Sequence, residues 1–565
     1  MNSPDFSSIK TRNRRRLIGA SGIREIDYMY SQTTRDVWHE LTAAKMNHEA
    51  ANRVSTMPRE QAKMHPTRSR QRLRYMPEAT GPPSTHDDTL HPSQPKPTLD
   101  LSTEVAQELV EHYLIKIHDR PHSLFHPPTL RDEVRRGAIN RALLLAICSM
   151  GCRFSSDSRI QSLELSMVQE SKRLLQADLE NICLENIQTC ILIANLCAGH
   201  FNPSSEALYF RIANGMAEIL GLNSTSFVGS IVMLEVRRRV WWTLFMADRW
   251  CSSGIGLPRQ IKELGGTVDL PMDETIFQSL SLDLENLATS WKPGLWAHMI
   301  SLVQHFGPIQ DLNRRSAQGG VEDDELDGEV AYLARQLELW EKMLPTDSKM
   351  TDENFHLHQD KGTGGAFVAL HLGYHHYSTL LYFRFLEDQR SSTDLRKNCA
   401  SLCKHHASAY SALLRRARET TRCEAVYPTV GHMAVVSSSV LLHTLLFGHE
   451  DEIQTARHKL NANFEALLEL KQYWPSMESM IQRLVTFQNI CLLSVEHSSH
   501  RLDGWMVRFL IEHSLPLEAR GFQAVPSGIE MEPDSLSLMA QEFTEQGRYT
   551  DFGFPTLQDW ETGVV

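Results

Sequence analysis

Apolar residues recur at helical spacing in one stretch after another from Leu101 to about Pro516, and this pattern limits the fold more than any other feature. Ser102 or Thr103 could cap the first stretch, because a short side-chain oxygen accepts a hydrogen bond from the first free amides of a helix. Further helices are expected at residues 140–152, 161–179, 185–196, 205–220, 235–251, 327–344, 365–387, 394–418, 430–447, 452–473 and 477–497. Alternation with a period of two is nearly absent. We therefore predict an all-α fold with one large helical domain over residues 101–516.

The first 100 residues differ from the rest of the chain in charge and composition. They hold 16 Lys and Arg against 11 Asp and Glu, whereas the whole chain of 565 residues has a net charge of −12. They are rich in Ser, Thr and Pro and lack apolar periodicity, so they cannot bury enough surface to offset the entropy lost on ordering. We predict a disordered basic arm and proline-rich linker over residues 1–100. Its arginines either contact nucleic-acid phosphates or an import receptor, or are solvated without a partner; the candidates are Arg12, Arg14, Arg15, Arg16, Arg68, Arg70, Arg72 and Arg74.

The C-terminal residues 517–565 form an acidic tail. Residues 529–565 contain eight acidic residues and one basic residue, Arg548, with five aromatic residues among them. Such a segment suits binding to a coactivator or corepressor, because the charge keeps the aromatic rings exposed until a partner covers them. The alternative is a tail that docks on its own helical domain through the same rings.

The densest pattern lies in residues 235–251, where apolar and aromatic residues cover more than half of a helix. We expect this helix in the core. Glu235 can pair with Arg238 or Arg239 one turn further on. Asp248 lies on or beside the buried stripe and needs hydrogen-bond or cationic partners there, because an unpaired buried carboxylate costs several kcal/mol.

These residues resemble the fungal-specific transcription factor domain, the middle homology region of fungal zinc-cluster regulators. The most specific part of the resemblance is carried by Glu235, Arg238, Trp241, Trp242, Asp248, Arg249, Gly256 and Pro258. Looser similarity is found upstream at residues 112–113, 123–130 and 211–222, and downstream at residues 337–345, 370–385 and 398–400. We expect the central motif residues to be architectural.

The resemblance implies a nuclear regulator of transcription rather than an enzyme. The helical domain would mediate homo- or heterodimerisation, sense an effector, or restrain the acidic tail. Control of a metabolic or specialised-metabolite gene cluster is a common role in this family. A helical scaffold with no part in transcription is the alternative from outside the family.

Members of this family usually carry a binuclear zinc cluster, in which six cysteines hold two metal ions and aim a short helix at the major groove of DNA. The first cysteine of this chain is Cys148. We therefore expect no cofactor in this chain, and zinc only if an upstream segment with six cysteines belongs to the protein. DNA would be reached directly through that cluster or, without it, through a partner factor.

Cysteine usage and hydropathy indicate a reducing compartment and no membrane partner. Ten cysteines are too few for a disulfide scaffold in a chain of this length. No secretory signal is expected at the N-terminus, where polar and basic residues precede no apolar stretch. The least polar long stretch, residues 430–448, is interrupted by His and Ser and is expected to be a buried helix.

One enzymatic alternative rests on Asp323, Asp324 and Asp327. This spacing is similar to the Asp-rich motif with which helical terpene synthases hold Mg²⁺ and a diphosphate, and carboxylate oxygens suit that ion. The competing interpretation is a helix start, where acidic residues interact favourably with the helix dipole. We favour the helix start, because a second magnesium motif is not evident.

Three further patterns are expected to be structural. His371 and His375 have a spacing that can hold zinc, but no Glu follows His371 as it would in a metalloprotease. Cys399 and Cys403 lie one turn apart among apolar residues, close to His405 and His406, and are expected to be buried thiols. The glycines of residues 362–365 lack the Lys and Ser or Thr of a phosphate-binding loop.

Overall fold

The computed structural model of the chain describes residues 101–120, 122–224, 229–261, 268–281, 291–319, 322–386, 394–495, 504–511 and 513–514. These residues are helical and contain no β-strand; two isolated β-bridges, His118 with His122 and Met272 with Pro293, are the extended pairings among them. The all-α prediction is confirmed. The basic arm with its eight candidate arginines and the acidic tail lie outside the described residues.

The helices come in the following order. The first group is α2 (Thr103–Lys116), α3 (Pro127–Arg136), α4 (Arg141–Cys152), α5 (Ser158–Gln161), α6 (Glu164–Ala177), α7 (Leu184–Gly199), α8 (Pro203–Ile219), α9 (Ile231–Gly254) and α10 (Glu274–Ser279). The second group is α11 (Leu295–Gln318), α12 (Asp323–Met343), α13 (Asp352–Asp360), α14 (Gly364–Tyr382), α15 (Asp394–Arg418), α16 (Thr429–Phe447), α17 (Glu450–Lys471), α18 (Ser476–Val495) and α19 (Gly504–Ile511), with short 3₁₀ turns η1 (Thr346–Ser348) and η2 (Phe383–Leu386).

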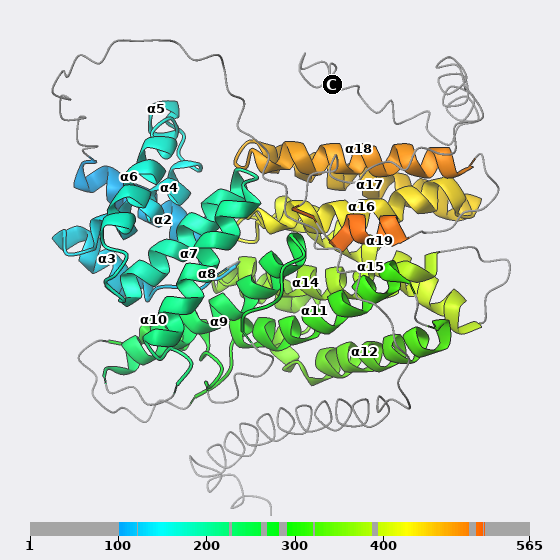
Figure 1. Cartoon of the computed structure of the whole chain (residues 1–565), viewed down its shortest axis with the longest axis horizontal. Coiled ribbons are helices and arrows are strands. Elements are labelled where there is room, and N and C mark those ends of the chain that lie inside the picture. Colours follow the sequence, from blue (N-terminus) through cyan, green and yellow to red (C-terminus); the bar gives the residue numbers. More distant parts are fainter. Residues whose placement is uncertain are drawn as a thin grey trace, which may run out of the picture. The chain divides into compact units, whose positions relative to one another are not determined.

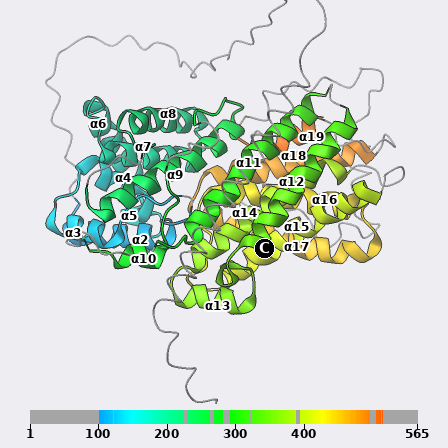
Figure 2. The ribbon, with the colours of Figure 1, turned by 90° about the horizontal axis from the view of Figure 1, so that it is seen from below.

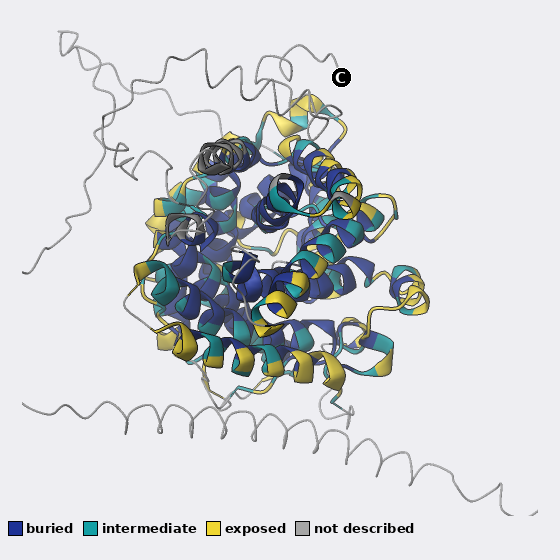
Figure 3. Cartoon of the chain, turned by 90° about the vertical axis from the view of Figure 1, so that its right-hand side faces the viewer, coloured by how far each residue is buried: buried dark blue, intermediate teal, exposed yellow. Residues whose placement is uncertain are grey.

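The two groups pack as two halves of one compact unit (Figure 1). In the first half α7 packs on α8 and α4, and α9 packs on α8. In the second half α14 lies against α11 and α15, and α16 lies against α15, α17 and α18. Helices α9 and α11 contact each other across the two halves, which lie side by side in both views (Figure 2). Buried residues gather on the faces that the helices turn toward one another (Figure 3).

Local sequence explains where several helices begin and end. Ser102 caps α2 by accepting a hydrogen bond from the Val105 amide, and Asn140 and Ser230 cap α4 and α9 in the same way. Gly137 ends α3 with φ +64°, a left-handed conformation that glycine adopts without steric cost. Of the two residues that could cap the first helix, Ser102 is the one that does so.

Helix α11 was not among the expected helices, although it is one of the three longest of the described part of the chain. Its sequence contains Gly307 and Pro308, which usually interrupt a helix. The helix continues through them because its inner face is buried, including Trp296, Phe306 and Leu312. Packing therefore outweighs the one backbone hydrogen bond that the proline removes.

The structure also contains the expected buried helix and the expected buried thiols. Helix α16 is the buried helix predicted from residues 430–448, and no helix in the described ranges is both long and apolar enough to cross a bilayer. The cysteines whose side chains are described are free thiols, buried except for the half-buried Cys183. Burial raises the pKa of most of them, to about 12 for Cys190, so these thiols are poor nucleophiles and poor metal ligands at neutral pH.

Candidate functional site

Helix α9 carries the densest sequence motif, and its first polar residue is Glu235. The Glu235 side chain is fully buried. Its carboxylate accepts hydrogen bonds from Arg239 Nε at 3.0 Å, from Arg238 Nη1 at 2.6 Å and from the backbone amide of Met272 at 2.8 Å. Both pairings that were expected from helical spacing are therefore present, and the carboxylate also holds a segment that lies 37 residues further along the chain.

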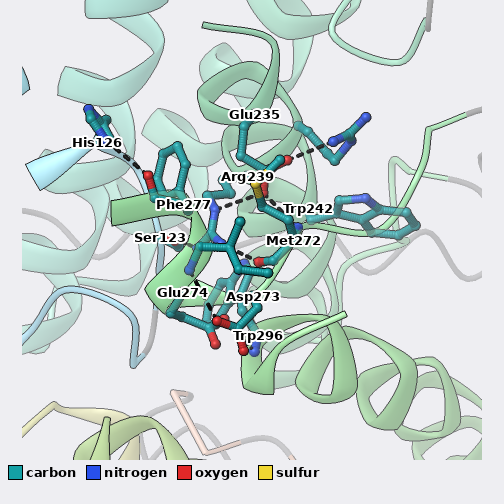
Figure 4. A network of polar contacts seen from close by, with 12 residues as sticks. Ser123, His126, Glu235, Arg239, Trp242, Met272, Asp273, Glu274, Phe277 and Trp296 are labelled. Atoms are coloured by element: carbon teal, nitrogen blue, oxygen red, sulfur yellow. Dashed lines mark hydrogen bonds and ion pairs between the residues drawn. The ribbon is translucent and has the colours of Figure 1, made fainter. Parts of the chain in front are cut away.

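Arg239 is the centre of this network (Figure 4). Its guanidinium is fully buried and donates to Glu235, to Ser123 Oγ at 3.0 Å and to the carbonyl of Met272 at 2.6 Å. It also lies 4.4 Å from the ring centroid of Phe277. One side chain of α9 thus joins the segment before α3 to the segment before α10.

The three consecutive arginines of the motif have different surroundings. Arg237 donates to the carbonyl of Leu220 at the end of α8. Arg238 is mostly buried and reaches the exposed carboxylate of Asp269 at 3.3 Å in addition to Glu235. Only Arg239 points into the core. A run that looks uniformly basic in sequence therefore has different surroundings at each position, although Arg238 and Arg239 share Glu235 as a partner.

Glu274 extends the network to α11. It is buried, and its two carboxylate oxygens accept hydrogen bonds from the backbone amides of Leu295 at 3.0 Å and Trp296 at 2.9 Å. These amides belong to the first turn of α11, where free N–H groups and the helix dipole favour an acidic partner. Burial raises the pKa of Glu274 to about 7, although the charge of Arg239 acts in the opposite direction.

The two tryptophans of the motif face the core. Trp241 and Trp242 are buried, and Trp242 packs edge to face on Phe245. The indole N–H of Trp242 donates to the carbonyl of Asp269 at 2.9 Å, so its polar atom is paired. The expectation that this helix lies in the core is confirmed.

Asp248 and Arg249 hold the loop that follows α9. The Asp248 carboxylate is buried and accepts hydrogen bonds from the backbone amides of Gln260 and Ile261, each at 3.0 Å. The Arg249 guanidinium lies 3.4 Å from the ring centroid of Phe245 and contacts the carbonyl of Ile261 at 3.5 Å. Asp248 therefore has the polar partners that its position requires, and most of them are backbone amides.

Gly256 and Pro258 shape the same loop. Gly256 has φ +68°, and the Leu257 amide bonds back to the carbonyl of Ser252 at 2.9 Å, which ends the helix. The carbonyl of Pro258 accepts a hydrogen bond from Arg211 on α8 at 2.9 Å. The motif residues after α9 thus fix the loop against two helices.

The acidic cluster at the start of α12 forms ion pairs with arginines. Asp323 lies 3.0 Å from Arg384 and 3.2 Å from Arg396, and Asp327 lies 3.1 Å from Arg396. Asp324 is exposed. The carboxylates of Asp323 and Asp327 are therefore paired with guanidinium groups, and this arrangement favours the helix-start interpretation of the cluster.

The histidine and cysteine pairs also have structural partners. His371 contacts the carbonyl of Ser348 at 3.0 Å, whereas His375 contacts His406 at 3.0 Å, so the two do not share a site. Cys403 is buried and faces the carbonyl of Thr379 at 3.6 Å. Within the described ranges, no group of three His, Cys, Asp or Glu residues is placed to hold a metal ion.

The glycines near residue 364 are packing residues. A Cβ atom on Gly364 would lie 2.6 Å from the sulfur of Cys423, and one on Gly365 would lie 2.1 Å from the guanidinium of Arg120. Both glycines stand at the start of α14. Their role in the described structure is to let α14 approach its neighbours closely.

Sequence reasoning missed the partners of the motif that come from distant segments. Ser123 is within the looser upstream similarity, but nothing in its local pattern indicates a contact with a residue 116 positions later. Glu274 lies in a short helix that was not expected. It lies 21 residues before Leu295, the first residue of α11, so no local pattern indicates that it contacts the start of this helix.

Comparison with known proteins identifies the domain that contains this network. Residues 110–342 match the profile described as the fungal specific transcription factor domain. This part of the chain is similar to the fungal-specific transcription factor domain. The match includes all of α9, the loop after it and the upstream segments that contact Arg239. The family is one of transcription factors and not of enzymes, as the resemblance implied.

Similar proteins include Zn(2)-C6 fungal-type transcription factors of Fusarium oxysporum f. sp. lycopersici. FTF1c is 23% identical over 432 residues, covering 69% of this chain and 46% of the relative, and FTF2 is 24% identical over 437 residues, covering 68% and 40%. An uncharacterized transcriptional regulatory protein of Schizosaccharomyces pombe is 21% identical over 486 residues, covering 69% and 49%. The chain spans less than half the length of these relatives. No solved structure matches it.

Proposed function

We propose that this protein is a fungal regulator of transcription whose fungal-specific transcription factor domain is the regulatory part. The observation that carries the proposal is the match over residues 110–342, which is centred on the buried network of α9. In the proposal the motif residues are architectural: Glu235 and Arg239 join the loops around α9, and Asp248 and Arg249 hold the loop that follows.

The proposed route to DNA is either a binuclear zinc cluster outside these residues or a partner factor. The names of the Fusarium relatives, which are Zn(2)-C6 transcription factors, support the first route. Sixteen basic residues among residues 1–100 would add salt-dependent phosphate contacts or nuclear import. The proposed location is the nucleus, and the further partners are a coactivator or corepressor at residues 517–565 and a second regulator subunit.

A reporter experiment tests this proposal. In a fungal host, the full chain is fused to a heterologous DNA-binding domain whose DNA site is known and stands upstream of the reporter. Reporter output is compared with that of the unfused chain at a matched protein level. We expect at least a severalfold change in output that requires the fusion. A second fusion that ends at residue 516 keeps the described domain and should lose that change if the acidic tail recruits the coregulator.

Chromatin occupancy and localisation complete the test. The epitope-tagged chain is mapped on chromatin, and two arm variants are compared, one with Arg12, Arg14, Arg15 and Arg16 replaced by Ser and one with the four arginines 68, 70, 72 and 74 replaced by Ser. We expect nuclear accumulation and discrete occupied sites in genes of a metabolic or specialised-metabolite cluster. If the chain stays in the cytosol and leaves the tethered reporter unchanged, the proposal of a transcription regulator is rejected and a helical scaffold is favoured.

A further inference from the structure

A cavity of about 380 Å³ lies where the end of α9 and the loop after it face the middle of α11. Its α9 side is formed by Arg249, Ser252 and Ser253, and its α11 side includes Gln310 and Arg314. This volume is within the range of small-molecule sites in proteins. None of the hydrogen-bond partners of Arg239 lines this cavity.

Gln310 is the observation that points to a ligand. Its side chain is 2% exposed and lines the cavity, yet neither the amide nitrogen nor the amide oxygen has a hydrogen-bond partner in the protein. Leaving such a group unpaired costs about 1–3 kcal/mol. Asn313, one turn further on α11 and equally buried, provides the contrast because its amide donates to the carbonyl of Leu380 at 3.0 Å.

The charge of the lining favours an anion. Three guanidinium groups line the cavity, those of Arg249, Arg259 and Arg314, against a single lining carboxylate, that of Asp311; Arg249 also lies 3.8 Å from the Asp248 carboxylate, which is not part of the lining. Arg259 and Arg314 lie 2.5 Å and 3.5 Å from Asp311, so one acid is shared by two cations. A planar carboxylate on a ligand matches the fork of a guanidinium better than a neutral group does.

Apart from Gly307 of α11, the remaining lining residues are apolar and come from the loop that Asp248 holds in place. Leu257, Pro258 and Ile261 form this part of the wall. A ligand that fills the cavity therefore needs a compact apolar part in addition to its charge. An inorganic anion would leave this wall without contacts.

We propose that this cavity binds a small organic acid. Its carboxylate pairs with the arginines, a second polar group satisfies the amide of Gln310, and its carbon skeleton lies against Leu257 and Pro258. This proposal concerns binding alone and stands whether or not the protein regulates transcription.

Thermal unfolding of the purified full chain tests the proposal with a fixed panel of probes. 4-Hydroxybenzoate, succinate and citrate are compared with 4-hydroxybenzamide, succinamide and inorganic phosphate at equal ionic strength. We expect at least one of the three carboxylates to raise Tm by stabilising the folded state, with a smaller shift from phosphate and none from the amides. If no carboxylate raises Tm, or if phosphate raises it as much, the site is not an organic-acid site.

Variants locate the binding. We expect Gln310→Leu and Arg314→Gln to weaken the affinity for the active carboxylate about tenfold or more, which is the usual loss when one hydrogen bond to a charged group is removed. Arg315→Gln is the matched control, because Arg315 is the next residue on α11 but pairs with Glu329 outside the cavity; it should change the affinity by less than about twofold. Equal binding by all three variants would overturn the proposed site.

The stability of Gln310→Leu without ligand is also informative. The substitution removes an unpaired buried amide, so the variant should unfold at the same or a higher temperature than the natural chain in probe-free buffer. A lower Tm would mean that Gln310 contributes to folding rather than to binding. Arg314 is one-third exposed, so Arg314→Gln should leave the fold intact and keeps the binding test decisive even then.

Discussion

Replacing Arg239 with Met tests whether the buried network of α9 contributes more to stability than an ordinary surface ion pair does. Arg239 is fully buried, and its guanidinium donates to Glu235, Ser123 and the Met272 carbonyl. Methionine fills a similar volume without charge. The variant keeps the hydrogen bond from Arg238 to Glu235, but the Met272 carbonyl loses its guanidinium donor.

The expected cost follows from these contacts. Breaking a buried ion pair by removing one partner costs about 3–5 kcal/mol. An unfolding entropy of about 2.1 cal/mol/K per residue gives about 0.8 kcal/mol/K for a domain of roughly 400 residues. If the domain unfolds as one unit, Tm should therefore fall by about 5 °C. Arg238→Met is the matched control on the same helix turn, and the loss of one hydrogen bond to Glu235 at about 1.5 kcal/mol should lower Tm by about 2 °C.

Scanning calorimetry or tryptophan fluorescence of the full chain measures the Tm of both variants under one set of conditions. The double variant Glu235→Leu with Arg239→Met should be less unstable than the sum of its single variants, because it removes both partners of the buried Glu235–Arg239 pair together. If Arg239→Met lowers Tm no more than Arg238→Met does, the central position of Arg239 in the network is wrong.

Three further outcomes are expected. Burial lowers the pKa of His376 to about 3, so its neutral side chain contributes stability above pH 6.5 that is lost as pH falls toward 3. At pH 5 the loss is about 2 kcal/mol, and His376→Phe should reduce the fall in Tm measured between pH 7.5 and pH 5. Asp248→Asn replaces an acceptor that two loop amides share, and should lower Tm by a few degrees and speed proteolytic cleavage of residues 255–261. Asn at both Asp323 and Asp327 should leave the cellular phenotype of the protein unchanged and shift Tm only slightly; a lost phenotype with unchanged Tm would revive the magnesium hypothesis.

The helices that could be predicted are those whose periodicity is strong and uninterrupted. Residues 394–418 and 430–447 were expected as helices and are observed as α15 (Asp394–Arg418) and α16 (Thr429–Phe447). Helix α11 was missed because Gly307 and Pro308 interrupt its pattern, and the short helices α10, α13 and α19 were missed because they are too brief for a periodic signal. What overrides the local signal in α11 is burial, which depends on neighbours from both halves of the domain.

The site could be predicted only in its local part. Glu235 and its two arginines lie within one or two turns of the same helix, so spacing alone indicated their pairing. The main partners of Asp248 are amides on a loop, and those of Arg239 include Ser123, 116 residues away. Such contacts depend on tertiary packing, and no single sequence carries a signal for them.

The last described residues, His513 and Ser514, contact the end of α9, and this contact determines which C-terminal truncations leave the folded domain intact. The amide of Ser514 donates to the carbonyl of Gly254 at 3.1 Å, and a Cβ on Gly254 would come within 2.8 Å of both Ser514 Oγ and His513 Nε2. A deletion that begins before residue 515 therefore removes a wall of the folded domain along with whatever follows it. Loss of output from such a deletion would report damage to the domain, and only cuts placed after Ser514 can assign a separate activity to the tail.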